Sequence, residues 1–119
     1  HWDAPRLMRE TLHGIEIAAG RGFALDAVGV DAWGVDYGLL DASGELLGLP
    51  FHYRDERVAG MVEQARALID PDALYAATGC QTLPLNTLYQ LLAHRSSPTF
   101  DRAATLLLLP DLLAYWLSG

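Results

Sequence analysis

Acidic, basic and aromatic residues gather at two places in the first half of the chain, each beside a short apolar run. The first is Asp31–Asp36, which reads DAWGVD and is broken by Gly34, and the second is His52–Arg57, which reads HYRDER. In an α/β protein, strand ends beside a glycine break are where a ligand site usually lies. The sequence therefore predicts that any chemistry of this protein takes place at these two segments.

Asp31 and Asp36 are the residue type that acid-base catalysis and metal binding use, but their spacing does not favour a pair. Five residues apart on a continuous strand, the two carboxylates would face opposite sides of the sheet. Only a turn at Gly34 would bring them together, so capping and turn roles are the better interpretation. Gly34 itself either lets a ligand approach the backbone or only allows the chain to form a turn.

The segment from Tyr53 to Arg57 has two interpretations. Carboxylate and guanidinium groups hydrogen-bond to sugar hydroxyls, and an aromatic ring covers an apolar sugar face, so the segment suits a hydroxyl-rich ligand. The alternative is a solvated strand end with an ion pair between Arg54 and Asp55, or between Asp55 and Arg57, which contributes little at a surface. Composition alone does not separate these two interpretations.

The composition excludes several classes of function. Eight basic against fifteen acidic residues give a formal charge of −7, and the scattered arginines form no basic face for a nucleic acid or an anionic membrane. The single cysteine, Cys80, allows neither an internal disulfide nor a zinc site, and it fits a reducing cytoplasm. The four histidines lack metal-ligand spacing, and no nucleophile elbow or glycine-rich phosphate loop is present. The apolar tract 105–117 is too short to span a bilayer.

The elements that must position the two segments follow from apolar spacing and turn signals. Met8, Leu12 and Ile15 fall on one face of a helix that Asp3 can cap. Asp41–Gly44 lies between two apolar runs and predicts a hairpin turn. The predicted helices cover residues 4–19, 58–69, 73–78, 87–94 and 111–117, and the predicted strands cover residues 23–30 and 105–109. This order predicts an α/β fold.

Several motifs together resemble the rhamnulokinase family of FGGY carbohydrate kinases. They are Gly29–Tyr37, Leu39–Asp41, Gly48–Pro50, Tyr53–Asp55 with Arg57, Thr78–Gly79, Leu83–Pro84, Asn86–Leu91, Leu109–Asp111 and Leu117–Gly119. The resemblance covers nearly the whole chain, in order and at family-like separations. The GVDAWGVD and LPLNTLYQL segments are specific, whereas the PDLLAYWLSG ending is shared more widely among FGGY kinases. Ser118 stands where threonine is commoner, which is a mild departure.

The resemblance implies both a fold and a reaction. The family has two actin-like (ribonuclease-H-like) domains, each with a mixed sheet and flanking helices, and it transfers the γ-phosphoryl group of ATP to L-rhamnulose with Mg2+. Residues 1–119 would then be a fragment of the N-terminal domain. The leading strands with the phosphate motif, the catalytic aspartate and most ATP contacts would lie outside it. We therefore expect no catalytic, cofactor-binding or metal-binding residue in this chain, and no activity from the chain alone.

On the sugar side, the resemblance assigns four substrate-binding residues, which are Gly34, Tyr53, Asp55 and Asn86. It implies a cytoplasmic enzyme with a small ketose and ATP as its partners. Two alternatives stay open: another FGGY sugar or polyol kinase, and a non-catalytic actin-like half-domain that binds a sugar or a protein. We also expect the chain by itself to be marginally folded, because a sheet without its leading strands exposes edge backbone.

Overall fold

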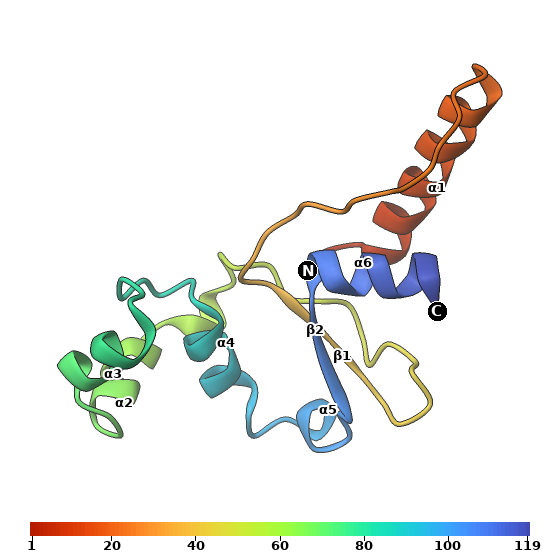
Figure 1. Ribbon diagram of the computed structural model, residues 1–119. Helices are drawn as coiled ribbons and strands as arrows, with labels where there is room; N and C mark the ends of the chain where they lie inside the picture. Colours follow the sequence, from red (N-terminus) through yellow and green to blue (C-terminus); the bar gives the residue numbers. More distant parts are fainter.

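A computed structural model of the protein describes residues 1–119, and its elements mix helices with a small sheet (Figure 1). The elements in chain order are α1 Ala4–Gly20, β1 Tyr37–Leu40, the 3-10 helix η1 Glu56–Val58, α2 Met61–Arg66, α3 Pro71–Thr78, α4 Thr87–His94, α5 Pro98–Asp101, β2 Thr105–Leu108 and α6 Leu109–Ser118. This content is compatible with the predicted α/β class.

The sheet is a single antiparallel pair rather than the mixed sheet that the family resemblance implied. Tyr37 of β1 lies opposite Leu108 of β2, and Leu40 lies opposite Thr105. The chain passes directly from β2 into α6, which packs over the pair. The small core consists of the buried Ala4, Leu40 and Leu112, with Leu46, Leu107 and Trp116 packed against them. The core therefore joins the start of α1 to the two strands and α6.

The turn and cap signals of the sequence are confirmed. The side chain of Asp3 accepts a hydrogen bond from the backbone N–H of Arg6 at 3.0 Å and begins α1. At the predicted hairpin turn, Gly44 donates its backbone N–H to the carbonyl of Asp41. The second arm of this hairpin is shorter than expected, because it forms only an isolated bridge between Leu40 and Leu46.

The predicted strand over residues 23–30 is wrong for the structure. No backbone–backbone hydrogen bond involves residues 24–34, which run back beside the projecting α1 (Figure 1). Phe23, Leu25 and Val28 are 63%, 46% and 52% exposed. The sequence has strand character here, but a strand forms only against a neighbour, and no other strand of the structure lies beside this segment.

Two helix predictions need smaller corrections. The helix predicted over residues 58–69 is divided, because Gly60 adopts a left-handed conformation with φ of 75° between η1 and α2. Between the predicted elements 87–94 and 105–109, the structure adds a short helix, α5, whose cap is the Ser97 side chain. Both differences are local, and neither moves the segments that carry the candidate site.

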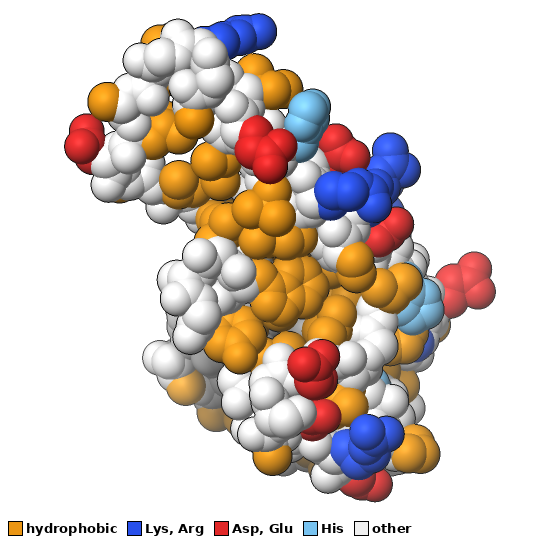
Figure 2. Space-filling model, turned by 90° about the vertical axis from the view of Figure 1, so that its right-hand side faces the viewer, with side chains coloured by type: hydrophobic (Ala, Val, Ile, Leu, Met, Phe, Trp, Pro, Cys, Tyr) orange, Lys and Arg blue, Asp and Glu red, His pale blue; other side chains and the backbone are white.

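The molecule is elongated. Its radius of gyration is 17.0 Å, with extents of 56 × 31 × 23 Å, whereas a compact domain of this length would have a radius of about 13.5 Å. Only 14 of 119 residues are buried, and Figure 2 shows hydrophobic side chains gathered across the middle of one face. Much apolar surface therefore remains uncovered.

No helix has the length and apolar character needed to cross a membrane.

Candidate functional site

The carboxylate of Asp36 lies at the start of β1 and is completely buried. Its Oδ2 accepts hydrogen bonds from Trp2 Nε1 at 2.5 Å and from the backbone N–H of Tyr53 at 3.2 Å. Its Oδ1 accepts from Gln90 Nε2 at 2.9 Å. Asp36 thus joins the segment before α1, the loop after residue 50 and α4. A buried carboxylate with three neutral donors is a structural anchor.

The structure does not bring Asp31 to Asp36. Asp31 is exposed while Asp36 is buried, and no three His, Cys, Asp or Glu side chains lie close enough to hold a metal ion. The predicted turn or capping role is wrong for Asp36, because its carboxylate accepts hydrogen bonds from Trp2, Tyr53 and Gln90 in distant segments.

Gln90, on the buried face of α4, connects Asp36 to the half-buried Arg57. Its Oε1 accepts a hydrogen bond from Arg57 Nη2 at 3.0 Å, while its Nε2 lies 3.2 Å from the carbonyl of Val35 and 3.0 Å from that of Leu85. The Arg57 guanidinium also lies over the ring of Phe51, at 3.7 Å from its centroid. The Nε and Nη1 atoms of Arg57 are buried without a partner. The Gln90 oxygen is therefore the one hydrogen-bond acceptor of this guanidinium.

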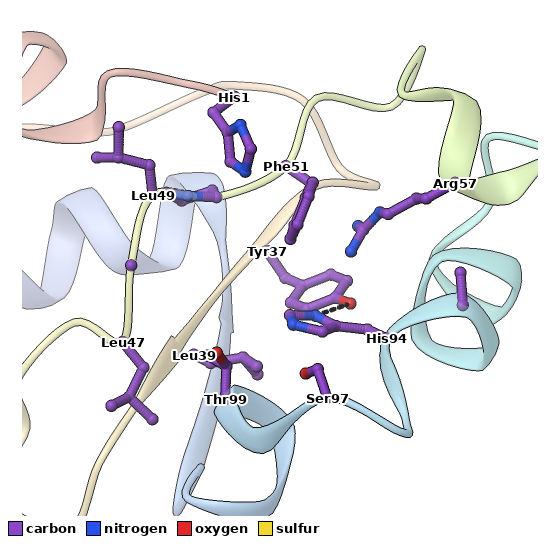
Figure 3. A pocket seen from close by; sticks show the side chains of 13 residues that line it. His1, Tyr37, Leu39, Leu47, Leu49, Phe51, Arg57, His94, Ser97 and Thr99 are labelled. Atoms are coloured by element: carbon purple, nitrogen blue, oxygen red, sulfur yellow. Dashed lines mark hydrogen bonds between the residues drawn. The ribbon is translucent and has the colours of Figure 1, made fainter.

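The first cavity, which we call the Arg57 cavity, encloses about 400 Å³ between β1, α4 and the loop around Phe51 (Figure 3). In Figure 3, Arg57 and His94 both reach toward Tyr37. The Tyr37 hydroxyl lies 3.1 Å from His94 Nδ1. Burial raises the pKa of Tyr37 above its ordinary 10.0, although Arg57 opposes the shift. Burial, with a smaller contribution from the Arg57 charge, lowers the pKa of His94 below its ordinary 6.5.

The second cavity, which we call the Gly34 cavity, encloses about 410 Å³ and contains two of the four predicted sugar-binding residues, Gly34 and Asn86. It has no charged lining residue. Its lining is Gly34, Val35, Leu74, Thr78, Cys80, Gln81, Thr82, Leu83, Asn86, Thr87, Leu88 and Tyr89. Gly34 lies in a turn, and a Cβ on it would meet no atom within 4 Å. Asn86 immediately precedes α4, and its Nδ2 donates to the carbonyl of Gln81 at 2.8 Å. The cavity thus offers hydroxyl, amide and backbone groups.

The other two predicted residues, Tyr53 and Asp55, line neither cavity. The ring of Tyr53 stacks on His52 with centroids 4.3 Å apart, and Arg54 lies 5.3 Å from its centroid. Asp55 Oδ1 accepts the backbone N–H of Arg57 at 2.9 Å and caps η1. Neither alternative ion pair of Asp55, with Arg54 or with Arg57, is formed.

Sequence reasoning did not single out Gln90, Arg57 or Thr87 as organising residues of this region. Thr87 Oγ1 donates to the carbonyl of Val35 at 2.7 Å, which fastens the head of α4 to the turn at Gly34. One signal for Gln90 was available, because it lies between Tyr89 and Leu91 in an otherwise apolar helix. A long amide in such a place needs buried hydrogen-bond partners.

The lining residues of the two cavities do not fit Mg2+ or a nucleoside triphosphate. Neither cavity has a carboxylate among its lining residues, which a magnesium site needs. The Gly34 cavity has no cation for phosphate groups, and the guanidinium of Arg57 is occupied with Gln90 and Phe51. No step through metal or nucleotide follows from these residues.

Comparisons with known proteins confirm the resemblance that the motifs carry. The chain is 44% identical to a protein named rhamnulokinase from Pectobacterium atrosepticum, over 99% of this chain and 24% of that protein. It is 41% identical to proteins of the same name from Klebsiella pneumoniae subsp. pneumoniae and Yersinia pestis, each over 99% of this chain and 25% of the relative. The chain spans about a quarter of the length of the curated relatives it matches. No family model matches the chain.

Proposed function

We propose that this chain contributes the sugar-binding side of a rhamnulokinase-type carbohydrate kinase of the FGGY family. The reaction would transfer the γ-phosphoryl group of ATP to L-rhamnulose and give L-rhamnulose 1-phosphate. The proposal is supported by 40% identity or more to proteins of that name over nearly the whole chain. Because the match covers about a quarter of each relative, it concerns one part of such an enzyme.

The observation that carries the sugar assignment is the meeting of Gly34 and Asn86 in one uncharged cavity. The two residues are far apart in sequence and come from different motifs. A volume of about 410 Å³ lies within the range of small-molecule sites. Neutral hydroxyl and amide groups match the hydroxyls of an uncharged ketose, and no lining charge has to lose its water when such a ligand enters. The cavity therefore favours a sugar over a charged substrate.

In this proposal, the chain orients the sugar and removes water from it, while other residues of a complete kinase bind ATP and Mg2+. Gly34 would let the ligand approach the backbone of the turn, and Asn86 would hydrogen-bond a sugar hydroxyl. Tyr53 and Asp55 would join the site only with a ligand or a further part of the enzyme beside them. Holding the acceptor hydroxyl in place is a large part of phosphoryl-transfer catalysis.

The test is a coupled assay of ADP release by the full-length protein against L-rhamnulose, L-fuculose and D-xylulose. We expect the highest kcat/KM with L-rhamnulose. The Asn86→Ala variant should raise the ketose KM, whereas Gln64→Ala, which removes an exposed amide on α2, should not. A higher kcat/KM with another ketose would identify that ketose as the substrate instead. If no ketose stimulates ADP release, the proposal is wrong.

A further inference from the structure

We infer that Gln90 is a positioning residue that holds the sugar-side segments in register by acting as an oriented amide between the buried Asp36 carboxylate and the guanidinium of the half-buried Arg57. The inference rests on the proposed function, and it adds a residue that contacts no substrate. Gln90 is 1% exposed and lies outside the lining of the Gly34 cavity.

The orientation of the amide follows from its partners. Its oxygen faces the Arg57 guanidinium at 3.0 Å, and its nitrogen faces the Asp36 carboxylate at 2.9 Å. The reverse orientation would place NH2 against a cation and oxygen against an anion. The carbonyls of Val35 and Leu85 add two more acceptors on the nitrogen side. The environment therefore selects one side chain, with an acceptor on one end and donors on the other.

Each predicted sugar-side residue is one short step from this amide. Val35 follows Gly34, and Leu85 precedes Asn86, so the amide nitrogen lies within hydrogen-bond distance of both turns that border the cavity, and its two N–H groups are shared among these carbonyls and Asp36. Through Asp36, it is connected to the backbone N–H of Tyr53. On its other end, Arg57 donates its backbone N–H to Asp55. One side chain thus links three segments, which are residues 34–36, 53–57 and 85–86.

A negative charge at position 90 should move the segments that carry Gly34, Tyr53 and Asn86 out of position, and not only make them less stable. Gln90→Glu keeps the shape and can still accept from Arg57, but it sets a carboxylate against that of Asp36 and against two carbonyl oxygens. Gln90→Met keeps the volume and leaves Arg57 without its acceptor. The double variant Asp36→Asn with Gln90→Glu removes the repulsion between the two carboxylates, because the amide introduced at position 36 can donate to the new carboxylate; the two carbonyl oxygens remain.

The experiment compares these variants in the full-length protein, with KM for L-rhamnulose and for ATP measured separately. We expect Gln90→Glu to raise the ketose KM at least tenfold and to change the ATP KM less than twofold. The double variant should reverse at least a third of the increase in the logarithm of the ketose KM. Gln64→Glu, an isosteric change at an exposed position of α2, is the matched control and should change neither.

The outcomes separate this inference from the proposed function. An inactive wild-type protein overturns both. An active wild type whose Gln90→Glu variant keeps its ketose KM overturns the positioning role alone. Equal increases in the ketose KM and the ATP KM would show that Gln90 is only structural. A double variant whose ketose KM is as high as that of Gln90→Glu would show the same. If Gln90→Glu fails to fold, a double variant that also fails to fold counts against the inference, and one that folds with a near-normal ketose KM supports it.

Discussion

Two glycines four residues apart, Gly34 and Gly38, should respond differently to an added side chain, one in its effect on ketose KM and the other in its effect on stability. Gly34 lines its cavity, and a Cβ there would meet nothing within 4 Å. Gly38 lies in β1, and a Cβ there would lie 2.9 Å from Leu112 Cδ2 and 3.1 Å from Leu46 Cδ1. Neither glycine has a positive φ. The comparison therefore isolates the effect of space.

For Gly38→Ala, the magnitude follows from overpacking. Leu112 is completely buried and cannot withdraw, so the strain costs about 1–3 kcal/mol. The reduced entropy of the unfolded chain offsets roughly 0.4–1 kcal/mol of this. We expect a net loss of about 1–2 kcal/mol in the free energy of unfolding.

For Gly34→Val, we expect stability within about 0.5 kcal/mol of wild type, and hence a Tm within about 2 °C. The three added carbons occupy space that the sugar would use, so the ketose KM should rise about tenfold or more. Thermal denaturation and steady-state kinetics on the full-length protein measure both quantities. If Gly34→Val melts several degrees earlier and keeps its ketose KM, Gly34 is only a turn residue and the site assignment fails.

Three further outcomes are expected. Asp36→Ala should lower the free energy of unfolding by about 2–5 kcal/mol in urea titrations, because it leaves the buried donors of Trp2 and Tyr53 without an acceptor; the exposed Asp31→Ala should stay within about 0.5 kcal/mol, and equal effects would contradict the anchoring role. The pKa of His94 is lower in the folded than in the unfolded state, so the folded state binds fewer protons. Stability should be fully present above the unfolded value of 6.5 and decline as pH falls from 6.5 through the folded-state pKa. Melting curves from pH 7.5 to 5.0 should show this decline reduced in His94→Gln, and parallel curves would refute it. Residues 1–119 alone should release no ADP in response to a ketose, and measurable release would show that the chain holds its own base and nucleotide site.

Features that depend on neighbouring residues could be predicted from the sequence. Asp3 caps its helix, as its residue type indicates. The turn at Asp41 likewise depends on local hydrogen bonds, with the Ser43 hydroxyl as the main cause of the lowered pKa of that carboxyl. These predictions hold because the partners lie within a few residues of each other.

Features that depend on distant partners could not be predicted in this way. The segment 23–30 has the composition of a strand, yet composition does not say whether a neighbour is present. Of the predicted sugar-side residues, Gly34 and Asn86 line one cavity, but Tyr53 and Asp55 contribute to turns and caps. Gln90 was missed because three of the four hydrogen bonds that its side chain makes beyond α4 are long-range, to Arg57, Asp36 and Val35, and only the one to Leu85 is local.

The pairing of β1 with β2 also has a consequence for the order in which the molecule folds. Leu40 meets Thr105 across the sheet, so the pairing closes the loop from Asp41 to Ala104, and every helix from α2 to α5 lies within that loop. Closing so long a loop costs more chain entropy than forming a helix, and contacts of high sequence separation slow folding. The helices between the strands can form early and repeatedly. We therefore expect the closure of the sheet, and with it the burial of Asp36 immediately before β1, to be the slow step of the folding reaction.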